Sequence, residues 1–192
     1  MPKRIILGID PGSRHTGYAI LVEEGRVFRA IACDAIHVDH LKDHTDRLQY
    51  LYRAVTDLIR EYRPTDCAVE TPVYGVDPLA MLKLGRAQAA ALLAIANEEL
   101  PVCEYYPKAI KKAVTGNGNA AKKQVAYMLE KLVTLPSNRM SADASDALAV
   151  AWCHQMALDR PVGTSSGKAY HQNNGKSSWA AFVDENPDRV SS

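Results

Sequence analysis

The sequence lacks a net charge of either sign, paired cysteines and long apolar runs. Its 23 Lys and Arg residues nearly balance 22 Asp and Glu residues, which leaves a formal net charge of +1. Proteins dedicated to nucleic-acid binding often carry a large overall excess of basic residues. If this chain binds a polyanion, its positive charge must therefore be concentrated in one region.

Cysteines are few and lie far apart. None of the four, Cys33, Cys67, Cys103 and Cys153, belongs to a C-x-x-C pair. This spacing argues against a zinc ribbon or a redox motif and favours free, buried thiols in a reducing compartment. The sequence also shows no signal peptide and no apolar run that approaches the length of a membrane-spanning helix. We therefore expect a cytoplasmic protein with no membrane partner.

The composition changes near Arg160. Up to that residue the apolar and charged residues have the balance of an ordinary globular domain, whereas residues 161–192 are rich in Gly, Ser, Asn and Lys. A segment of that kind buries too little apolar surface to offset the entropy cost of ordering it. We expect one domain over residues 1–160, followed by a disordered tail over residues 161–192.

The hydrophobic pattern predicts strands first, then alternating helices and strands. The expected strands cover residues 4–9, 16–22, 26–33, 66–70 and 101–105. The expected helices cover residues 48–62, 78–99, 120–133 and 142–158, with Asp77, Asn119 and Ser141 as caps. Short links make the first three strands an antiparallel meander. The pattern is typical of an α/β fold with a mixed five-stranded sheet, antiparallel meander plus parallel strands, flanked by helices.

Four acidic residues occupy positions that folding alone does not explain. Asp10 closes the first apolar strand and Glu70 closes a later one. If these strands are parallel neighbours, their ends meet where open α/β sheets bind ligands. Asp143 and Asp146 are spaced i, i+3 in the first turn of the last helix, so they share one face.

Carboxylates gathered in one place repel one another and persist together when a cation compensates their charge. Ligands that are all oxygen favour Mg²⁺ or Mn²⁺ over zinc. Two such ions can activate a water molecule and stabilise the leaving oxygen of a phosphodiester. Each acid alone has an ordinary alternative: a turn for Asp10, an ion pair for Glu70 and a helix start for Asp143. Only the set predicts a two-metal phosphodiesterase.

A basic segment follows the last expected strand. It contains five lysines and no acidic residue, namely Lys108, Lys111, Lys112, Lys122 and Lys123. The polar stretch 115–119 between them leads into a helix N-terminus, and backbone N–H groups with lysines suit phosphate contact. The alternative is a solvated surface. Tyr74, in the loop after Glu70, either stacks on an unpaired base or packs within the loop.

A histidine-rich link also has the look of a metal site. His37, His40 and His44 lie close to Asp39 and Asp43 in the sequence. These residues fall in a polar connection between a strand and a helix and lack a regular ligand spacing. We expect a solvated loop there rather than a zinc site.

These motifs resemble the RuvC family, the bacterial Holliday junction (crossover junction) endodeoxyribonucleases. The matching segments are Ile6–Arg14, Thr16–Tyr18, Ala68–Glu70, Leu82–Arg86, Glu99–Val102, Glu104–Tyr105 and Lys122–Val125, and most specifically Ala142–Ala149. The similarity runs in order from about Lys3 to His154.

The resemblance implies an RNase H-like fold and a homodimer with two active sites. It implies an endonuclease that resolves four-way DNA junctions during recombination and repair, by symmetric, Mg²⁺-dependent nicks that leave ligatable 5′-phosphate ends. Family members act with the RuvA–RuvB branch-migration complex. By position, the resemblance makes Asp10, Glu70, Asp143 and Asp146 the metal-binding catalytic acids.

The resemblance also places Lys111 and Lys122 near the DNA, and it has one departure. Where the family usually has a phenylalanine that stacks on bases near the junction centre, this chain has Val73. The neighbouring Tyr74 is the candidate to take over that contact.

Three other functions compete with this interpretation. A kinase of the actin/hexokinase superfamily also has a strand, an Asp with glycines and a second strand, but it needs a second related domain for which residues 1–160 leave no room. A junction-binding module without catalysis requires a missing acid, and none of the four is missing. A related nuclease that cuts RNA stays open on the residues alone.

Overall fold

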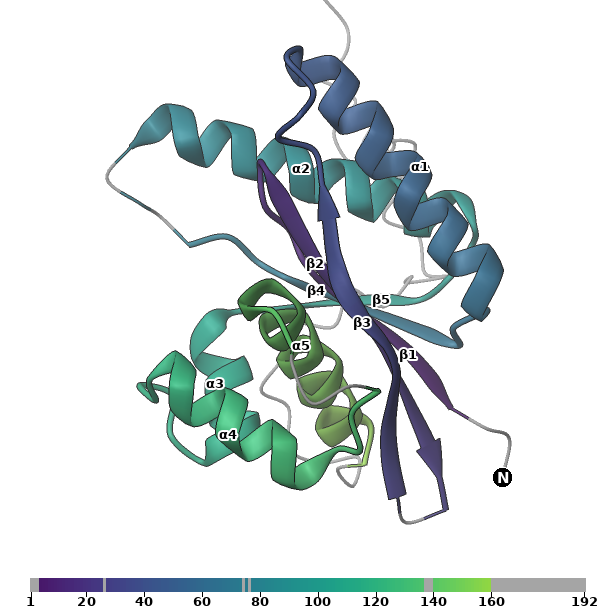
Figure 1. The fold of residues 1–192 in the computed structure, drawn as a ribbon, viewed down its shortest axis with the longest axis vertical. Coiled ribbons are helices and arrows are strands. Elements are labelled where there is room, and N and C mark those ends of the chain that lie inside the picture. The colour runs from purple at the N-terminus through teal and green to yellow at the C-terminus, as the bar shows by residue number, and fades with distance from the viewer. Residues whose placement is uncertain (1–3, 26, 74, 76, 137–139, 160–192) are drawn as a thin grey trace, which may run out of the picture.

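A five-stranded mixed sheet lies between two layers of helices (Figure 1). The computed structural model describes residues 4–25, 27–73, 75, 77–136 and 140–159. Tyr74, Arg26 and the tail from residue 160 lie outside the described residues, so the expectations for stacking and for a disordered tail are not tested. The strand order is β3-β2-β1-β4-β5.

The first three strands form the expected meander. Strands β1 (Ile5–Asp10), β2 (His15–Glu24) and β3 (Val27–His37) pair antiparallel. Strand β4 (Asp66–Glu70) then pairs parallel with β1, and β5 (Val102–Tyr105) pairs parallel with β4. The predicted mixed sheet of antiparallel and parallel strands is confirmed.

Helices cover both faces of the sheet because side chains of a strand alternate between its faces. On one face, Leu7 and Ile9 of β1 pack against α1 (His44–Tyr62) and α2 (Pro78–Asn97). On the other face, Ile6 packs in a cluster with α3 (Pro107–Thr115), α4 (Lys122–Leu132) and α5 (Ala142–Leu158). Figure 1 shows α3, α4 and α5 gathered on that side.

The helix starts were predicted with mixed success. Asp77 accepts hydrogen bonds from the N–H groups of Leu79 and Ala80, and Ser141 caps α5 through the N–H of Ala144, as expected. The cap predicted at Asn119 is wrong: α4 begins at Lys122, after residue Ala121, which makes no side-chain cap bond. Asn119 instead donates its backbone N–H to Asn117 in the preceding turn.

Helix α2 corrects one expectation about apolar runs. It is 20 residues long, its mean hydropathy over an 18-residue window is 1.4, and it meets the length and composition of a membrane-spanning helix. One side, which carries Ala87 and Ala91, is buried in the core against α1 and the sheet. Burial in the core therefore accounts for part of this apolar character, and the opposite side of the helix is exposed.

Candidate active site

Strands β1 and β4 bring two acids together at one edge of the sheet. The parallel register pairs Ile9 with Val69, so the next residues along each strand, Asp10 and Glu70, emerge side by side. Both strands are otherwise buried at their centres, because they form the middle of the sheet. The carboxyls therefore stand where the core strands end, as the sequence predicted.

Helix α5 carries the other two acids, and glycines let it approach the sheet. A Cβ atom on Gly17 would lie 2.0 Å from the carbonyl oxygen of Asp143, and one on Gly8 would lie 2.4 Å from that of Ala147. Only glycine leaves room for such backbone contact. Because Gly17 is the cross-strand partner of Asp10, the first turn of α5 lies directly over the end of β1.

The four acids are close enough to perturb one another. Burial, together with repulsion from the nearby carboxylates of Asp146 and Asp143, raises the pKa of Asp10 to about 7. Burial likewise raises the pKa of Glu70 to about 8, with added repulsion from Asp10 and Asp146. Asp10 thus interacts with all three other acids and lies at the centre of the group. Gathered carboxyls of this kind hold protons or require a cation.

Lys122 is the cation that this chain itself supplies. At the first position of α4, its Nζ lies 2.5 Å from Oδ2 of Asp146. This hydrogen bond raises the pKa of Lys122. The positive charge of Lys122 also opposes the rise in the pKa of Asp10 and Glu70, and Lys111 acts on Glu70 in the same direction. Of the five predicted lysines, these two adjoin the acids.

The other three lysines lie on the same two helices but farther out. Lys108 and Lys112 are exposed on α3, and Lys123 is exposed on α4. Their helices are joined by residues 116–121, and α3 had not been predicted as a helix. The basic segment is therefore a surface formed by α3, α4 and the turn between them, next to the acids. Within this segment, Lys111 and Lys122 are the lysines that lower the pKa of Glu70.

His15 is a neighbour of the acids that the sequence analysis missed. It begins β2, and its Nδ1 lies 3.9 Å from Oδ2 of Asp143. The amino-acid sequence alone does not indicate this contact, because His15 and Asp143 are far apart along the chain. The short turn Pro11–Arg14 could have predicted this position, because it brings the start of β2 back to the end of β1.

The acid group fits a hard divalent cation. Its donors are carboxylate oxygens alone, and burial with mutual repulsion raises the pKa of two of its carboxyls to about 7 and about 8, so a cation would favour their ionised form. Mg²⁺ and Mn²⁺ prefer such oxygen ligands. Lys122 and Lys111 at the rim add positive charge that suits a phosphate. The arrangement can therefore hold divalent cations against a phosphodiester.

Comparisons with known proteins point to one family. The family model "Crossover junction endodeoxyribonuclease RuvC" matches residues 6–154. Among curated relatives, a protein of Salinibacter ruber with that name is 46% identical over 187 residues, covering 97% of this chain and 99% of the relative. One from Porphyromonas gingivalis is 40% identical over 190 residues, covering 98% of this chain and 97% of the relative.

A solved structure extends the likeness to three dimensions. Thermus thermophilus RuvC in complex with a Holliday junction substrate matches with a TM-score of 0.74 and 28% identity, covering 81% of this chain and 94% of that one. The fold is the RNase H-like fold, as the resemblance implied. Together with the family match over residues 6–154, this establishes that the chain belongs to the RuvC family of crossover junction endodeoxyribonucleases.

Proposed function

We propose that this chain resolves four-way DNA junctions by metal-dependent nicking of two opposed strands. One observation carries the proposal: a RuvC-family chain gathers the carboxyls of Asp10, Glu70, Asp143 and Asp146 at one edge of its sheet, with Lys122 against them. Its relatives are named crossover junction endodeoxyribonucleases, and that of T. thermophilus was solved with a Holliday junction substrate.

The four carboxylates would hold Mg²⁺, with two ions per site and Mn²⁺ as a substitute. Asp10 would be shared between the ions, because it is the acid that interacts with all the others. Glu70 would hold one ion, and Asp143 with Asp146 the other. When bound, such ions supply an activated water and stabilise the leaving oxygen of the phosphodiester.

The residues of the chain itself perform three tasks in this reaction. The carboxyls of Asp10 and Glu70 give up their protons when a cation binds. Lys122, which pairs with Asp146, would contact the scissile phosphate and offset its charge. Lys111 adds positive charge beside Glu70.

The exposed lysines of α3 and α4 would hold the DNA backbone next to the site. Lys108, Lys112 and Lys123 are solvent-exposed, as phosphate contacts must be. Backbone contacts of this kind carry no sequence information, so they position the junction rather than select the cleavage sequence. Tyr74 stays a candidate for stacking on an unpaired base.

The exposed side of α2 would form the homodimer. Leu79, Leu82 and Leu93 are 69%, 50% and 56% exposed, and their spacing places them along one stripe of the helix. The exposed Arg86 lies between them on the same side, and exposed apolar residues beside an arginine are typical of a protein interface. Two copies joined there would present one active site to each of two opposed strands. The partner RuvA–RuvB complex and a cytoplasmic location complete the proposal.

The test uses an end-labelled synthetic four-way junction, with linear duplex and single strand as controls. The protein is incubated with Mg²⁺, with EDTA and as Asp146→Asn. We expect paired nicks in opposed strands of the junction alone, lost with EDTA and reduced more than about 100-fold in the variant, which still binds the junction. Binding without cleavage in Mg²⁺ or Mn²⁺ would indicate a binding module, and equal cleavage of all substrates would reject junction selectivity.

A further inference from the structure

The histidine-rich edge of the meander forms a second ligand cluster apart from the four acids. His15 starts β2 and His37 ends β3, and the antiparallel register makes them direct cross-strand partners. Their ring centroids lie 4.8 Å apart in an edge-to-face arrangement. Asp39, two residues beyond His37, turns back so that its Oδ1 lies 3.7 Å from Nε2 of His15.

These three side chains converge on one point. One ligand atom from each, an imidazole nitrogen from each histidine and a carboxylate oxygen, lies within 4.8 Å of the other two. In a tetrahedral zinc site with bonds of about 2.1 Å, the ligand atoms are roughly 3.4 Å apart. All three residues are exposed, so small side-chain rotations can close the remaining gap and water can fill the open positions.

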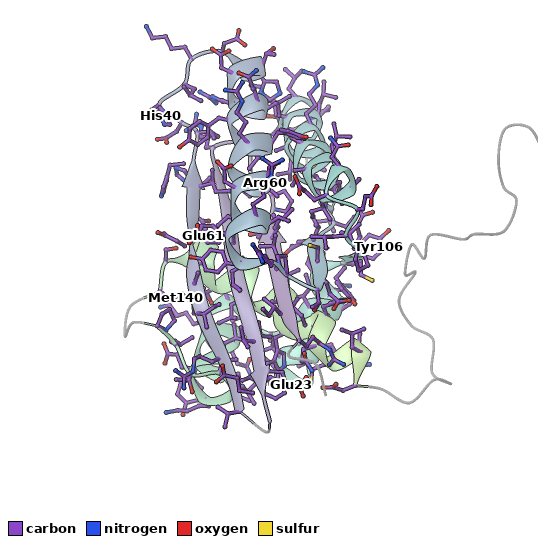
Figure 2. The ribbon with its side chains drawn as sticks, turned by 90° about the vertical axis from the view of Figure 1, so that its right-hand side faces the viewer. Glu23, His40, Arg60, Glu61, Tyr106 and Met140 are labelled. Atoms are coloured by element: carbon purple, nitrogen blue, oxygen red, sulfur yellow. The ribbon has the colours of Figure 1, made fainter. Side chains whose placement is uncertain are left out.

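Of the three histidines that lie close together in the sequence, only His37 belongs to this cluster. His40 and His44 are neighbours of His37 in the chain, but in the structure His40 packs edge-to-face against Tyr50 of α1 instead, 5.8 Å between ring centroids. Figure 2 shows His40 beside the end of the molecule at which α1 begins. His15, which lies on a different strand, takes their place in the cluster.

We propose that His15, His37 and Asp39 form an accessory site for a transition-metal ion of the Zn²⁺ type. Imidazole nitrogens suit zinc, copper and nickel, whereas Mg²⁺ requires oxygen ligands, so the two sites of this chain select different ions. The accessory site would thus be occupied without displacing the ions of the acid group.

His15 links the accessory site to the acid group. Its Nε2 faces Asp39, while its Nδ1 lies 3.9 Å from Oδ2 of Asp143. Histidines that ligate a metal through one ring nitrogen usually donate the other N–H to a carboxylate, which fixes the ring and strengthens the ligand. Asp143 is the candidate for that carboxylate, and a small rotation of the exposed His15 ring would bring it within hydrogen-bond distance. Zinc at the accessory site would therefore orient a side chain of the candidate active site.

The test is a calorimetric titration with Zn²⁺ at about pH 7.5, above the ordinary pKa of a free imidazole. It is made in excess Mg²⁺, in the wild type and in Asp146→Asn, which weakens the acid group as a competing site. We expect one Zn²⁺ per chain in both proteins. His37→Gln should weaken this binding more than about 10-fold, and His40→Gln, the matched control, should leave it unchanged.

A second readout separates the accessory site from the acid group. Co²⁺ in place of Zn²⁺ gives a visible absorption spectrum that responds to imidazole ligands, and this spectrum should change in His15→Gln and His37→Gln but persist in Asp146→Asn. The proposal is overturned if the wild type binds no Zn²⁺, if His37→Gln binds it as the wild type does, or if Asp146→Asn abolishes binding. Circular dichroism checks that each variant is folded.

Discussion

At the residue scale, Asp10 and Glu70 are carboxyls that hold their protons near neutral pH. Their pKa values of about 7 and 8 arise first from burial and then from neighbouring carboxylates. Lys122 opposes this rise only in part, since both pKa values stay well above those of exposed acids. Protons and divalent cations therefore compete for the same oxygens.

The first prediction concerns this competition. Cation binding must displace protons from Asp10 and Glu70, so the apparent affinity for Mg²⁺ should rise several-fold per pH unit between about pH 6 and pH 8. Half-saturating Mg²⁺ concentrations for junction cleavage, measured at three pH values in that range, give the result. A half-saturating concentration that does not change with pH would contradict it.

The second prediction concerns stability without metal. The pKa of Asp10 rises from 3.8 to about 7 on folding, so its contribution to folding is fully present below about pH 4 and is lost as the pH rises to about 7. Asp10→Asn cannot ionise. In EDTA we expect it to be more stable than the wild type by roughly 1–2 kcal/mol at about pH 8, since solvent access reduces the ideal 1.4 kcal/mol per unit.

Urea unfolding at several pH values measures this difference in unfolding free energy. The gain should shrink as the pH falls toward 5, because the wild-type carboxyl then stays protonated in the folded state. Asp57→Asn, on an exposed position of α1, is the control and should show no gain that grows with pH. A constant difference for Asp10→Asn would argue against a raised pKa.

The third prediction compares two adjacent lysines. Lys122 pairs with Asp146 and lowers the pKa of Asp10 and Glu70, whereas Lys123 is exposed beside it. Lys122→Met should reduce the cleavage rate at saturating Mg²⁺ by roughly 10- to 100-fold and move the pH–rate profile to higher pH. Lys123→Met should weaken junction binding slightly and leave the profile in place. Identical pH–rate profiles for the two variants would show that Lys122 does not act on the acids.

At the element scale, the sheet and the acid positions could be predicted because they depend on strong local patterns. Apolar strands ending in Asp10 and Glu70, and a helix start with two acids on one face, are visible in the sequence itself. Helix α3 was missed because its Lys-rich surface hides a short apolar pattern; Ile110 and Val114 are its only buried residues. Pro107, at its first turn, was the available signal.

What could not be predicted depends on residues that meet only in three dimensions. The place of His15 follows from the register of β2 against β3, in which it pairs with His37. Strand β3 extends to His37 rather than ending at Cys33, and the pattern did not reveal this because Asp34 and His37 break the apolar run around the buried Ile36. The close packing of α5 against the sheet depends on Gly8 and Gly17. Their role cannot be recognised until the position of α5 is known.

The fourth prediction tests this approach of α5. In Gly17→Ala the new methyl would meet the carbonyl of Asp143 at 2.0 Å, so the first turn of α5 must move away from the end of β1. We expect a loss of roughly 1–3 kcal/mol in unfolding free energy and of most of the cleavage activity. In Gly85→Ala on α2 the methyl meets nothing within 4 Å, and stability should hold or rise. Full activity in Gly17→Ala would show that the contact does not set the site.

At the scale of the whole molecule, we propose that the exposed stripe of α2 holds two copies of the chain together. The fifth prediction is that Leu93→Glu places a charge on this stripe and converts the dimer into a monomer, because an uncompensated charge is costly to bury in an interface. Sedimentation or light scattering measures the mass. Val27→Glu, which charges an exposed apolar residue at the start of β3, should leave the mass unchanged. Equal masses for both variants would place the interface elsewhere.

Helix α5 is buried along almost its whole length, and it contacts β1, β2, β3 and β4 as well as α3 and α4. The helix that carries Asp143 and Asp146 is thus also the central support of the domain. Such an element opens only when the entire domain opens. Heat inactivation should therefore coincide with the loss of tertiary structure in a single transition, and partial damage at the periphery should leave the site assembled. For this protein, cleavage activity that remains after heating therefore indicates that the hydrophobic core is still folded.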